Sequence, residues 1–416
     1  MNKLRKRVFC AAGYNTVSLG TGRKEFHPKK TRPGLEHYII EAGKGVLDQI
    51  GGAQNVDEGV ISNFMAARFN RQGNLAGIIP MIDPDLEYLP CTRVEGACGS
   101  GGMALYTSMK SILAETADVV LSLGVEVQNS VKAIYGADIL AGAGHYASER
   151  KQGHAYFFPS KFSDRAGALY EKFGYDTMRT AMAHWYVQAV ENARRCPKAQ
   201  EHHNANPDLF STGMMKPNPK GFVDHLNVFD CSKVSDGASA LVFTSEEGLN
   251  KIGISKQDAV ELVGYGQVEA NLSQPPKDPT RLTTSKTAVD RAYEMAGLTA
   301  RDIGVLEVHD CFTVSGLLSL EAAGMVQYGE WADFVTEGRI HYQTGDIPTN
   351  ASGGLVGFGH YTGGTGVRQA VDCLDQLTGK AGDYQVKLNA NKPYALMISM
   401  GGNDKTVTAM IFRKAE

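Results

Sequence analysis

The chain has 416 residues, of which 43% are hydrophobic and 21% charged, so it can bury a large core in two or more lobes. Its formal net charge of -3 leaves no excess of positive charge for binding a phosphate backbone, which argues against a nucleic-acid partner. The longest apolar runs have only the length of a strand, so we expect a soluble, enzyme-sized protein with no membrane span.

The first segment is basic, MNKLRKR, but the apolar run that follows at 8–12 is too short for a secretory signal. We interpret 8–12 as the first core strand. The last residues do not match the Ser-Lys-Leu type of peroxisomal targeting signal. The seven cysteines are odd in number and scattered, which favours a reducing compartment and no metal or disulfide framework. We therefore predict a cytoplasmic protein, and organellar targeting by a short transit peptide stays open.

Helix-like and strand-like segments alternate through both halves of the chain. Apolar residues at 35–50 recur every three or four positions, which predicts an amphipathic helix. Apolar runs predict further strands at 92–95, 119–125, 241–244, 262–265, 305–308, 395–398 and 407–412. This alternation predicts an α/β fold.

Cys98 lies in a glycine-rich motif, VEGACGSGG at 94–102, directly between a predicted strand and a predicted helix. The helix N-terminus would lower the pKa of the thiol, and the small neighbours would let backbone N–H groups face an oxyanion. We interpret Cys98 as a reactive nucleophile. The alternative is a packing turn in which the cysteine is incidental.

The region 126–224 breaks the alternation and is too long for an ordinary connection. It is rich in glycine, tyrosine, histidine and basic residues, with helical patterns at 164–172 and 177–194. We interpret it as an inserted loop domain, the kind of insertion that carries binding function on a rigid scaffold.

His309 and Cys311 lie in the motif HDCF at 309–312, between the strand 305–308 and a helix beginning near Thr313. Polar groups of α/β proteins gather where strands end, and this motif supplies an imidazole and a second titratable thiol. Metal binding is the competing interpretation, but no second Cys-His pair at ligand spacing supports it.

His360 lies in the motif SGGLVGFGHYTGGTG at 352–366, whose glycines indicate backbone that passes close to a ligand. A neutral imidazole there could accept the proton of Cys98, although alone it is equally consistent with a structural turn. The segments 96–126 and 352–403 look like distant copies, because each has a glycine-rich loop, a helix, a buried strand and a turn. Such a duplication would place Cys98 and His360 at equivalent helix starts, facing each other.

Together these motifs resemble the thiolase superfamily over nearly the whole chain, and the HDCF form resembles the sterol-carrier-protein type of thiolase. Further resemblance lies in GVE at 124–126, SDGA at 235–238 and AYEMAGL at 292–298. The resemblance implies a five-layered αβαβα core of two pseudo-symmetric α/β halves with an inserted loop domain. The implied division is 1–125, 126–224 and 225–416, with no lipid-transfer domain after the thiolase part.

The resemblance also implies a role for each catalytic candidate. Cys98 matches the acylated nucleophile, and His360 matches the imidazole that activates it and lines an oxyanion hole. His309 matches the residue that holds a catalytic water in that hole. Gly401 matches the glycine whose N–H joins that of Cys98 in a second hole, and Cys311 matches a second acid–base thiol.

The chain departs from the family pattern at several positions. Most thiolases carry a catalytic cysteine where this chain has Ser399, and the HDCF motif takes over that task in the sterol-carrier-protein type. Tyr361 stands where the family has proline after the loop histidine, and Gly364 stands where it has alanine. We expect a reshaped loop and a changed substrate preference. Asn403 and Asp404 replace further glycines.

The implied activity is that of a 3-ketoacyl-CoA thiolase or acetyl-CoA acetyltransferase, the reversible Claisen cleavage and condensation of 3-ketoacyl-CoA in fatty-acid metabolism. One alternative is a biosynthetic condensing enzyme on a thiolase-like frame. Cys311 argues against it, because a decarboxylating synthase needs no second thiol base. The other alternative is a non-catalytic acyl-CoA-binding protein, which the Tyr361 departure motivates.

The expected partners are acyl-CoA and acetyl-CoA, with coenzyme A as substrate or product and no permanently bound cofactor or metal. The family implies a homodimer or homotetramer. The phosphates of coenzyme A need cations, and the inserted region offers candidates that sequence does not single out. They are Arg150, Lys151, Lys161, Arg165, Lys216 and Lys220.

Overall fold

The strands of this protein form one mixed sheet. The computed structural model describes residues 4–416. Its strands are β1 (Phe9–Asn15), β2 (Glu58–Ser62), β3 (Cys91–Val94), β4 (Val119–Val127), β5 (Asp236–Thr244), β6 (Val260–Glu269), β7 (Ile303–Glu307), β8 (Tyr394–Gly401) and β9 (Thr406–Lys414). They lie in the order β3-β2-β4-β5-β1-β6-β9-β8-β7. Every predicted strand is present, whereas β2 was not predicted because its short run, EGVIS, begins with glutamate and glycine.

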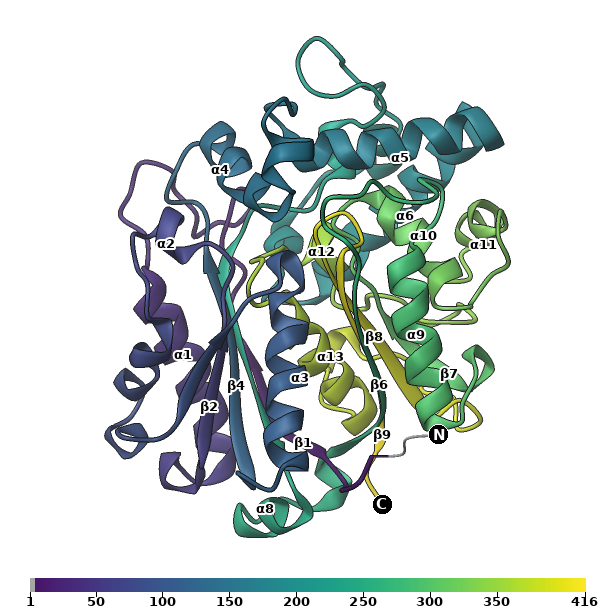
Figure 1. The fold of residues 1–416 in the computed structure, drawn as a ribbon. Coiled ribbons are helices and arrows are strands. Elements are labelled where there is room, and N and C mark those ends of the chain that lie inside the picture. The colour runs from purple at the N-terminus through teal and green to yellow at the C-terminus, as the bar shows by residue number, and fades with distance from the viewer. Residues whose placement is uncertain (1–3) are drawn as a thin grey trace.

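The helices cover both faces of this sheet. They are α1 (Leu35–Leu47), α2 (Ala66–Phe69), α3 (Ser100–Leu113), α4 (Ala133–Leu140), α5 (Phe157–Phe173), α6 (Tyr175–Arg195), α7 (Leu209–Gly213), α8 (Glu246–Lys251), α9 (Thr283–Ala296), α10 (Thr313–Ala322), α11 (Trp331–Thr336), α12 (Gly354–Gly357) and α13 (Thr365–Thr378). In Figure 1, α3 and α13 lie at the centre between two groups of strands, with α1 outside one group and α9 outside the other. The layers therefore alternate as helix, strand, helix, strand, helix, the predicted αβαβα order.

The two groups of strands repeat one topology. The order β1-β5-β4-β2 in the first group corresponds to β6-β9-β8-β7 in the second, and the bridge from Leu306 to Thr349 takes the place of β3. Among the strands of residues 4–416, the two groups pair with each other only where β1 meets β6, through Phe9 with Glu261 and Cys10 with Val260. The predicted pseudo-symmetry is confirmed, and this short seam between the halves is a feature that the sequence did not indicate.

The central helices α3 and α13 cross at glycines. A Cβ added to Gly101 would lie 2.5 Å from the backbone nitrogen of Gly366, and one added to Gly366 would collide with the backbone of Gly102. The two helices can approach this closely only because none of these positions carries a side chain. The crossing fixes where each helix begins relative to the other, and both helix starts carry candidate catalytic residues.

Gly101→Ala is therefore expected to lower the free energy of unfolding by about 1–3 kcal/mol, because its methyl group meets backbone that cannot move away cheaply. Urea unfolding followed by circular dichroism would measure the loss. Gly73→Ala is the matched control, since a Cβ there meets no other atom of residues 4–416 within 4 Å. Equal stabilities of the two variants would mean that the helix crossing relaxes freely.

The inserted region contributes the helices above the sheet. The predicted helical patterns correspond to α5 and α6, and α6 packs against α10, α11 and α12 of the second half (Figure 1). Throughout residues 4–416, none of the helices combines the length and the apolar character needed to cross a bilayer. The domain limits at 125/126 and 224/225 remain predictions.

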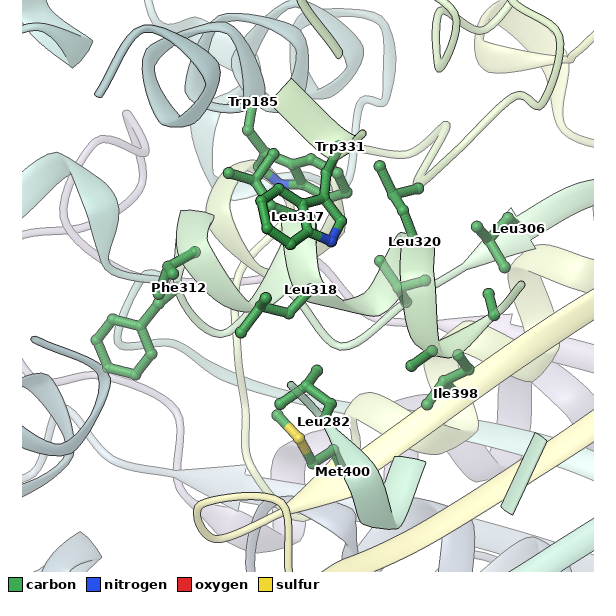
Figure 2. Close-up of a cluster of buried hydrophobic side chains, with 14 of the residues drawn as sticks. Trp185, Leu282, Leu306, Phe312, Leu317, Leu318, Leu320, Trp331, Ile398 and Met400 are labelled. Atoms are coloured by element: carbon green, nitrogen blue, oxygen red, sulfur yellow. The ribbon is translucent and has the colours of Figure 1, made fainter. Parts of the chain in front are cut away.

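A large apolar cluster surrounds α10, which is buried along its whole length. Figure 2 shows side chains of α6, α11 and β8 converging on this helix. The labelled members are Trp185, Leu282, Leu306, Phe312, Leu317, Leu318, Leu320, Trp331, Ile398 and Met400. Phe312 and Met400 are the neighbours of Cys311 and Gly401, so the cluster anchors two segments that carry candidate functional residues.

Candidate active site

Three candidate residues from three distant segments meet in one place. Cys98 precedes α3, His309 follows β7, and His360 precedes α13. The Cys98 sulfur and one ring nitrogen from each histidine all lie within 4.8 Å of one another. The two imidazoles stand edge to face, with centroids 5.1 Å apart and an interplanar angle of 87°. Sulfur and imidazole are also zinc-ligand types, but the acid–base arrangement described below accounts for all three groups and we assign no metal.

Small residues shape the turn that presents Cys98. Ala97 has a left-handed backbone with a φ of 54°, and the Ser100 hydroxyl fixes the turn by donating to the Ala97 carbonyl at 2.6 Å. Gly401 packs directly against this turn, because a Cβ on Gly99 would lie 3.0 Å from the Gly401 nitrogen. The end of β8 and the cysteine turn can therefore share a substrate atom between their N–H groups.

The thiol of Cys98 is protonated at rest, contrary to the lowered pKa expected from the helix N-terminus. Burial, with the negative charge of Glu126 in support, raises its pKa to about 12. The N–H groups of Gly402 and of Cys98 itself act in the opposite direction but are outweighed. Desolvation wins because few donors replace the water that a thiolate would need. Cys98 thus needs a base to become a nucleophile.

The surroundings of the His360 ring are compatible with the tautomer that such a base requires. The Thr365 hydroxyl lies 2.7 Å from His360 Nδ1 and 3.3 Å from the Tyr361 carbonyl, and when it donates to that carbonyl it accepts from Nδ1. In that arrangement the proton is on Nδ1 and the lone pair is on Nε2. This Nε2 is buried and finds no hydrogen-bond partner among residues 4–416. It is the ring nitrogen free to take a proton from Cys98.

Both imidazoles are neutral. Burial lowers the pKa of His360 to about 3, with the Arg368 charge adding to the effect. Burial, His360 and Arg368 lower the pKa of His309 well below its ordinary value. In the described chain neither ring nitrogen of His309 has a hydrogen-bond partner. The pair can therefore offer one basic nitrogen and one N–H donor to a bound molecule.

The buried carboxylate of Glu126, at the end of β4, ties the loops around this site together. Its oxygens accept from Asn63 Nδ2, Phe64 N, Met65 N, Thr362 Oγ1 and Gly363 N at 2.9–3.1 Å. Burial still raises its pKa. Sequence reasoning assigned Glu126 no role, although a glutamate directly after a buried strand is the signal that could have found it.

Cys311 lies behind this trio at the start of α10. Its sulfur is 3.6 Å from the Ser315 hydroxyl, and burial followed by the neighbouring Cys98 raises its pKa well above the ordinary value. Asp310 faces the other way, where it accepts from Trp185 Nε1 at 3.0 Å and from the Leu355 N–H at 2.7 Å. Burial raises the Asp310 pKa to about 6. The motif thus directs only its histidine and its cysteine toward Cys98.

Ser399 belongs to the helix crossing. A Cβ on Gly102 would lie 2.9 Å from the Ser399 Cβ, and one on Gly366 would lie 2.7 Å from its hydroxyl. This hydroxyl is buried without a hydrogen-bond partner in the part of the chain described. A serine fits there because its side chain is small.

The departures at Tyr361 and Gly364 are linked. Tyr361 is fully buried and its hydroxyl lies 2.9 Å from Ser239 Oγ on β5, so the ring packs in the core. A Cβ on Gly364 would lie 2.5 Å from the Tyr361 ring and 2.7 Å from the Gly124 carbonyl. The glycine thus makes room for the ring. We expected the tyrosine to change substrate preference, and its core position gives that expectation no direct support.

Three of the six cations considered for coenzyme A are paired or buried, and the other three are exposed. Arg150 pairs with Asp138 at 2.7 Å, and Lys161 pairs with Glu149 at 3.5 Å. Arg165 is only 1% exposed, so it cannot meet a phosphate at the surface. Lys151, Lys216 and Lys220 are exposed.

The pKa values give a testable pH profile for the thiol. Because the pKa of Cys98 is raised, its thiolate fraction is very small at pH 7 and grows about tenfold per unit as the pH rises. Alkylation of Cys98 by iodoacetamide, followed by peptide mass spectrometry, should therefore rise continuously from pH 7 to 10. Cys98→Ala identifies the peptide. A plateau below pH 8 would indicate a preformed thiolate–imidazolium pair and contradict the neutral assignment.

Comparisons with known proteins cover both halves of the chain. The model of the thiolase N-terminal domain matches residues 37–205, and the thiolase C-terminal domain-like model matches residues 265–414. An acetyl-CoA acetyltransferase from Methanothermobacter thermautotrophicus is 32% identical over 380 residues, covering 90% of this chain and 94% of the relative. Sterol carrier protein 2 from Homo sapiens is 30% identical over 311 residues, covering 72% of this chain and 54% of the relative.

A solved structure shares the whole architecture. The Ltp2-ChsH2(DUF35) aldolase superposes with a TM-score of 0.78 and covers 99% of both chains. Its sequence identity is 19%, so this likeness shows the fold alone.

Proposed function

Since the chain belongs to the thiolase family, we propose that it is an acyl-CoA acyltransferase that works through an acyl thioester on Cys98. One observation carries the proposal: the thiol of Cys98 lies within 4.8 Å of two neutral imidazoles, and the Nε2 atom of His360 has no hydrogen-bond partner among residues 4–416. The frame alone does not select this chemistry, because an aldolase shares it. The side chains of Cys98, His309 and His360 are what favour acyl transfer.

In the cleavage direction His360 Nε2 takes the Cys98 proton, and the sulfur attacks the 3-keto carbon of a 3-ketoacyl-CoA. The bond between the α-carbon and that keto carbon breaks, and its electron pair passes to the acetyl-CoA enolate, which Cys311 protonates. Coenzyme A then attacks the Cys98 thioester and carries the acyl group away. In condensation Cys311 removes the α-proton instead.

Negative charge develops on two carbonyl oxygens during these steps. His360 and His309, the latter through a water, would stabilise the negative charge on the thioester oxygen of the enolate by hydrogen bonds. The N–H groups of Cys98 and Gly401 would donate hydrogen bonds to the charged oxygen of the tetrahedral intermediate on Cys98. Each positioned donor of this kind contributes roughly 3 kcal/mol to the transition state in enzymes where it has been removed.

Cys311 supports this proposal over a decarboxylating condensing enzyme, since loss of carbon dioxide would make a second thiol base unnecessary. The neutral imidazoles support it over a non-catalytic acyl-CoA binder, because binding a thioester needs no such base. We also infer that the active form is a homodimer or homotetramer, as the family implies, and that the protein works in the cytoplasm on fatty-acid-derived thioesters.

A thiolysis assay tests both the acyltransferase activity and the specificity for 3-ketoacyl-CoA esters. The protein is incubated with coenzyme A and 3-ketoacyl-CoA esters of increasing chain length, and loss of the 3-keto absorbance is followed. Turnover of any ester with matching formation of acetyl-CoA is expected, and the preferred length defines the substrate. A folded protein that neither cleaves these esters nor becomes acetylated by acetyl-CoA would favour the binding protein.

A further inference from the structure

The three groups that serve acid–base chemistry in this site are also ligands of the kind that zinc binds. The Cys98 sulfur and one ring nitrogen each from His309 and His360 lie within 4.8 Å of one another. Metal bonds of about 2.0–2.3 Å in a tetrahedron would set these atoms roughly 3.3–3.6 Å apart. At most about 1.5 Å, shared between two side chains, separates the present arrangement from that geometry. Rotation of the side chains can supply a movement of this size.

The imidazole nitrogens of this group are free to bind. Both histidines are buried, His309 with 1% and His360 with 7% of its surface exposed. Neither ring nitrogen of His309 has a hydrogen-bond partner among residues 4–416, and neither does Nε2 of His360. Buried polar atoms are normally hydrogen-bonded, so three such nitrogens beside one thiol indicate a place where something binds.

The surroundings of the group also suit a metal ion. A histidine that binds a metal through one nitrogen usually donates its other N–H to an acceptor, which fixes the ring. Thr365 Oγ1 lies 2.7 Å from His360 Nδ1 and can play this part, which leaves Nε2 to bind the ion. Cys98 is half-buried, unlike the two histidines, so an ion from solvent can reach its sulfur before it contacts the rings.

The donor atoms decide which kind of ion fits. Thiolate sulfur and imidazole nitrogen bind zinc and similar ions such as cobalt(II), whereas Mg²⁺ and Ca²⁺ require oxygen ligands. The group consists of one cysteine and two histidines and contains no carboxylate. Three protein ligands leave a fourth position for water, which is the arrangement of an open zinc site rather than of a purely structural one.

We propose that Cys98, His309 and His360 form an inhibitory binding site for a zinc-type divalent cation, which takes no part in catalysis. On binding, the S–H bond of Cys98 breaks and its proton passes to solvent. The sulfur electron pair and one lone pair from each imidazole form the bonds to the metal, and no oxidation state changes.

The consequence is reversible inhibition. The ion holds both the sulfur that attacks the substrate and the nitrogen that accepts the sulfur's proton, so turnover stops until the ion is removed. Binding of the metal is independent of the proposed function, whereas the inhibition rests on it.

Protection of the Cys98 sulfur tests the site without reference to activity. The full-length protein is freed of metal with a chelator, and alkylation of Cys98 by iodoacetamide at pH 8 is followed by peptide mass spectrometry as Zn²⁺ is added. Mg²⁺ is the control ion. Titration with Co²⁺ reports a sulfur–metal bond directly through its thiolate-to-cobalt absorbance. Acetylation of Cys98 by acetyl-CoA, without added thiol reductant, is measured by intact mass with and without Zn²⁺.

Two site variants and two controls locate the ion. Cys98→Ala should abolish the thiolate-to-cobalt absorbance. His309→Gln should weaken the protection by Zn²⁺ more than about 100-fold, because losing a ligand costs more than the 10- to 100-fold of losing a contact that orients one. Cys91→Ala and His203→Ala should bind as the wild type does. The second control is needed because His202 and His203 form another close pair of rings, with centroids 4.8 Å apart.

Saturating Zn²⁺ is expected to slow alkylation of Cys98 and to block its acetylation until a chelator is added. Alkylation or acetylation at an unchanged rate would overturn the inference. So would Co²⁺ binding that persists in Cys98→Ala and disappears in His203→Ala, because the ion would then lie at the surface pair. If His309→Gln does not fold, Cys98→Ala decides alone. A wild type whose sulfur Zn²⁺ protects but acetyl-CoA never acetylates would keep the metal site and count against the proposed function.

Discussion

Cys98→Ala is expected to abolish turnover in both directions, by about 10⁴-fold or more, because the mechanism passes through a thioester on the sulfur that is removed. The variant should fold normally, since alanine only removes a sulfur from a turn of small residues and leaves Ser100 to hold the backbone. Substrate binding should persist. Thiolysis rates, thermal unfolding and binding of acetyl-CoA by calorimetry would be measured on the same preparation.

Cys91→Ala is the matched control, because Cys91 lies on the edge strand β3 and takes no part in the site. It should retain full activity. Intact mass after incubation with acetyl-CoA should show one acetyl group on the wild type and on Cys91→Ala, and none on Cys98→Ala. Activity of Cys98→Ala within tenfold of the wild type would remove Cys98 from the mechanism.

Cys311→Ala is expected to lower condensation and α-proton exchange by roughly 10²- to 10⁴-fold, the usual cost of losing a positioned acid or base. Acetylation of Cys98 should survive, because it needs the nucleophile, His360 and an oxyanion hole but no proton removal from carbon. Exchange of acetyl-CoA in deuterated water, followed by NMR, measures the first effect, and intact mass measures the second.

Ser399→Ala is the control for this assignment, since Ser399 stands where most thiolases have a second cysteine. Its hydroxyl packs against Gly102 and Gly366 at the helix crossing. A hydroxyl whose pKa lies far above neutrality is a poor base. Its loss should cost far less than that of Cys311. If Ser399→Ala stopped exchange while Cys311→Ala did not, the second base would be Ser399 and our assignment would be wrong.

Local patterns in the sequence were sufficient to place the elements that carry the candidate residues. The helical patterns at 164–172 and 177–194 are α5 and α6, and the apolar runs before Cys98 and His309 are strands. The similarity between the segments 96–126 and 352–403 was informative because it predicted equivalent positions in the two halves. Cys98 and His360 could therefore be expected to face each other. The strand β2 was not predicted, because its five residues begin with glutamate and show too little of the apolar pattern of a strand.

Properties that depend on burial could not be predicted in this way. The thiol of Cys98 was expected to have a lowered pKa from its helix start, but the surrounding protein and Glu126 raise it. Arg165 was grouped with the surface cations because its neighbours in sequence are polar, whereas the structure buries it against three carbonyl-type acceptors. In both cases the deciding contacts come from segments far along the chain, which no local pattern reports.

The short seam between β1 and β6 has a consequence for synthesis on the ribosome. The inner face of the first half-sheet is covered in part by α13, and β1 has a free edge until β6 arrives. A nascent chain that has emerged only as far as α8 would therefore expose apolar surface and an unpaired strand edge, the features that make intermediates aggregate. Completion must wait for the last two strands, so this protein is expected to depend on chaperones until its C-terminal segment is released.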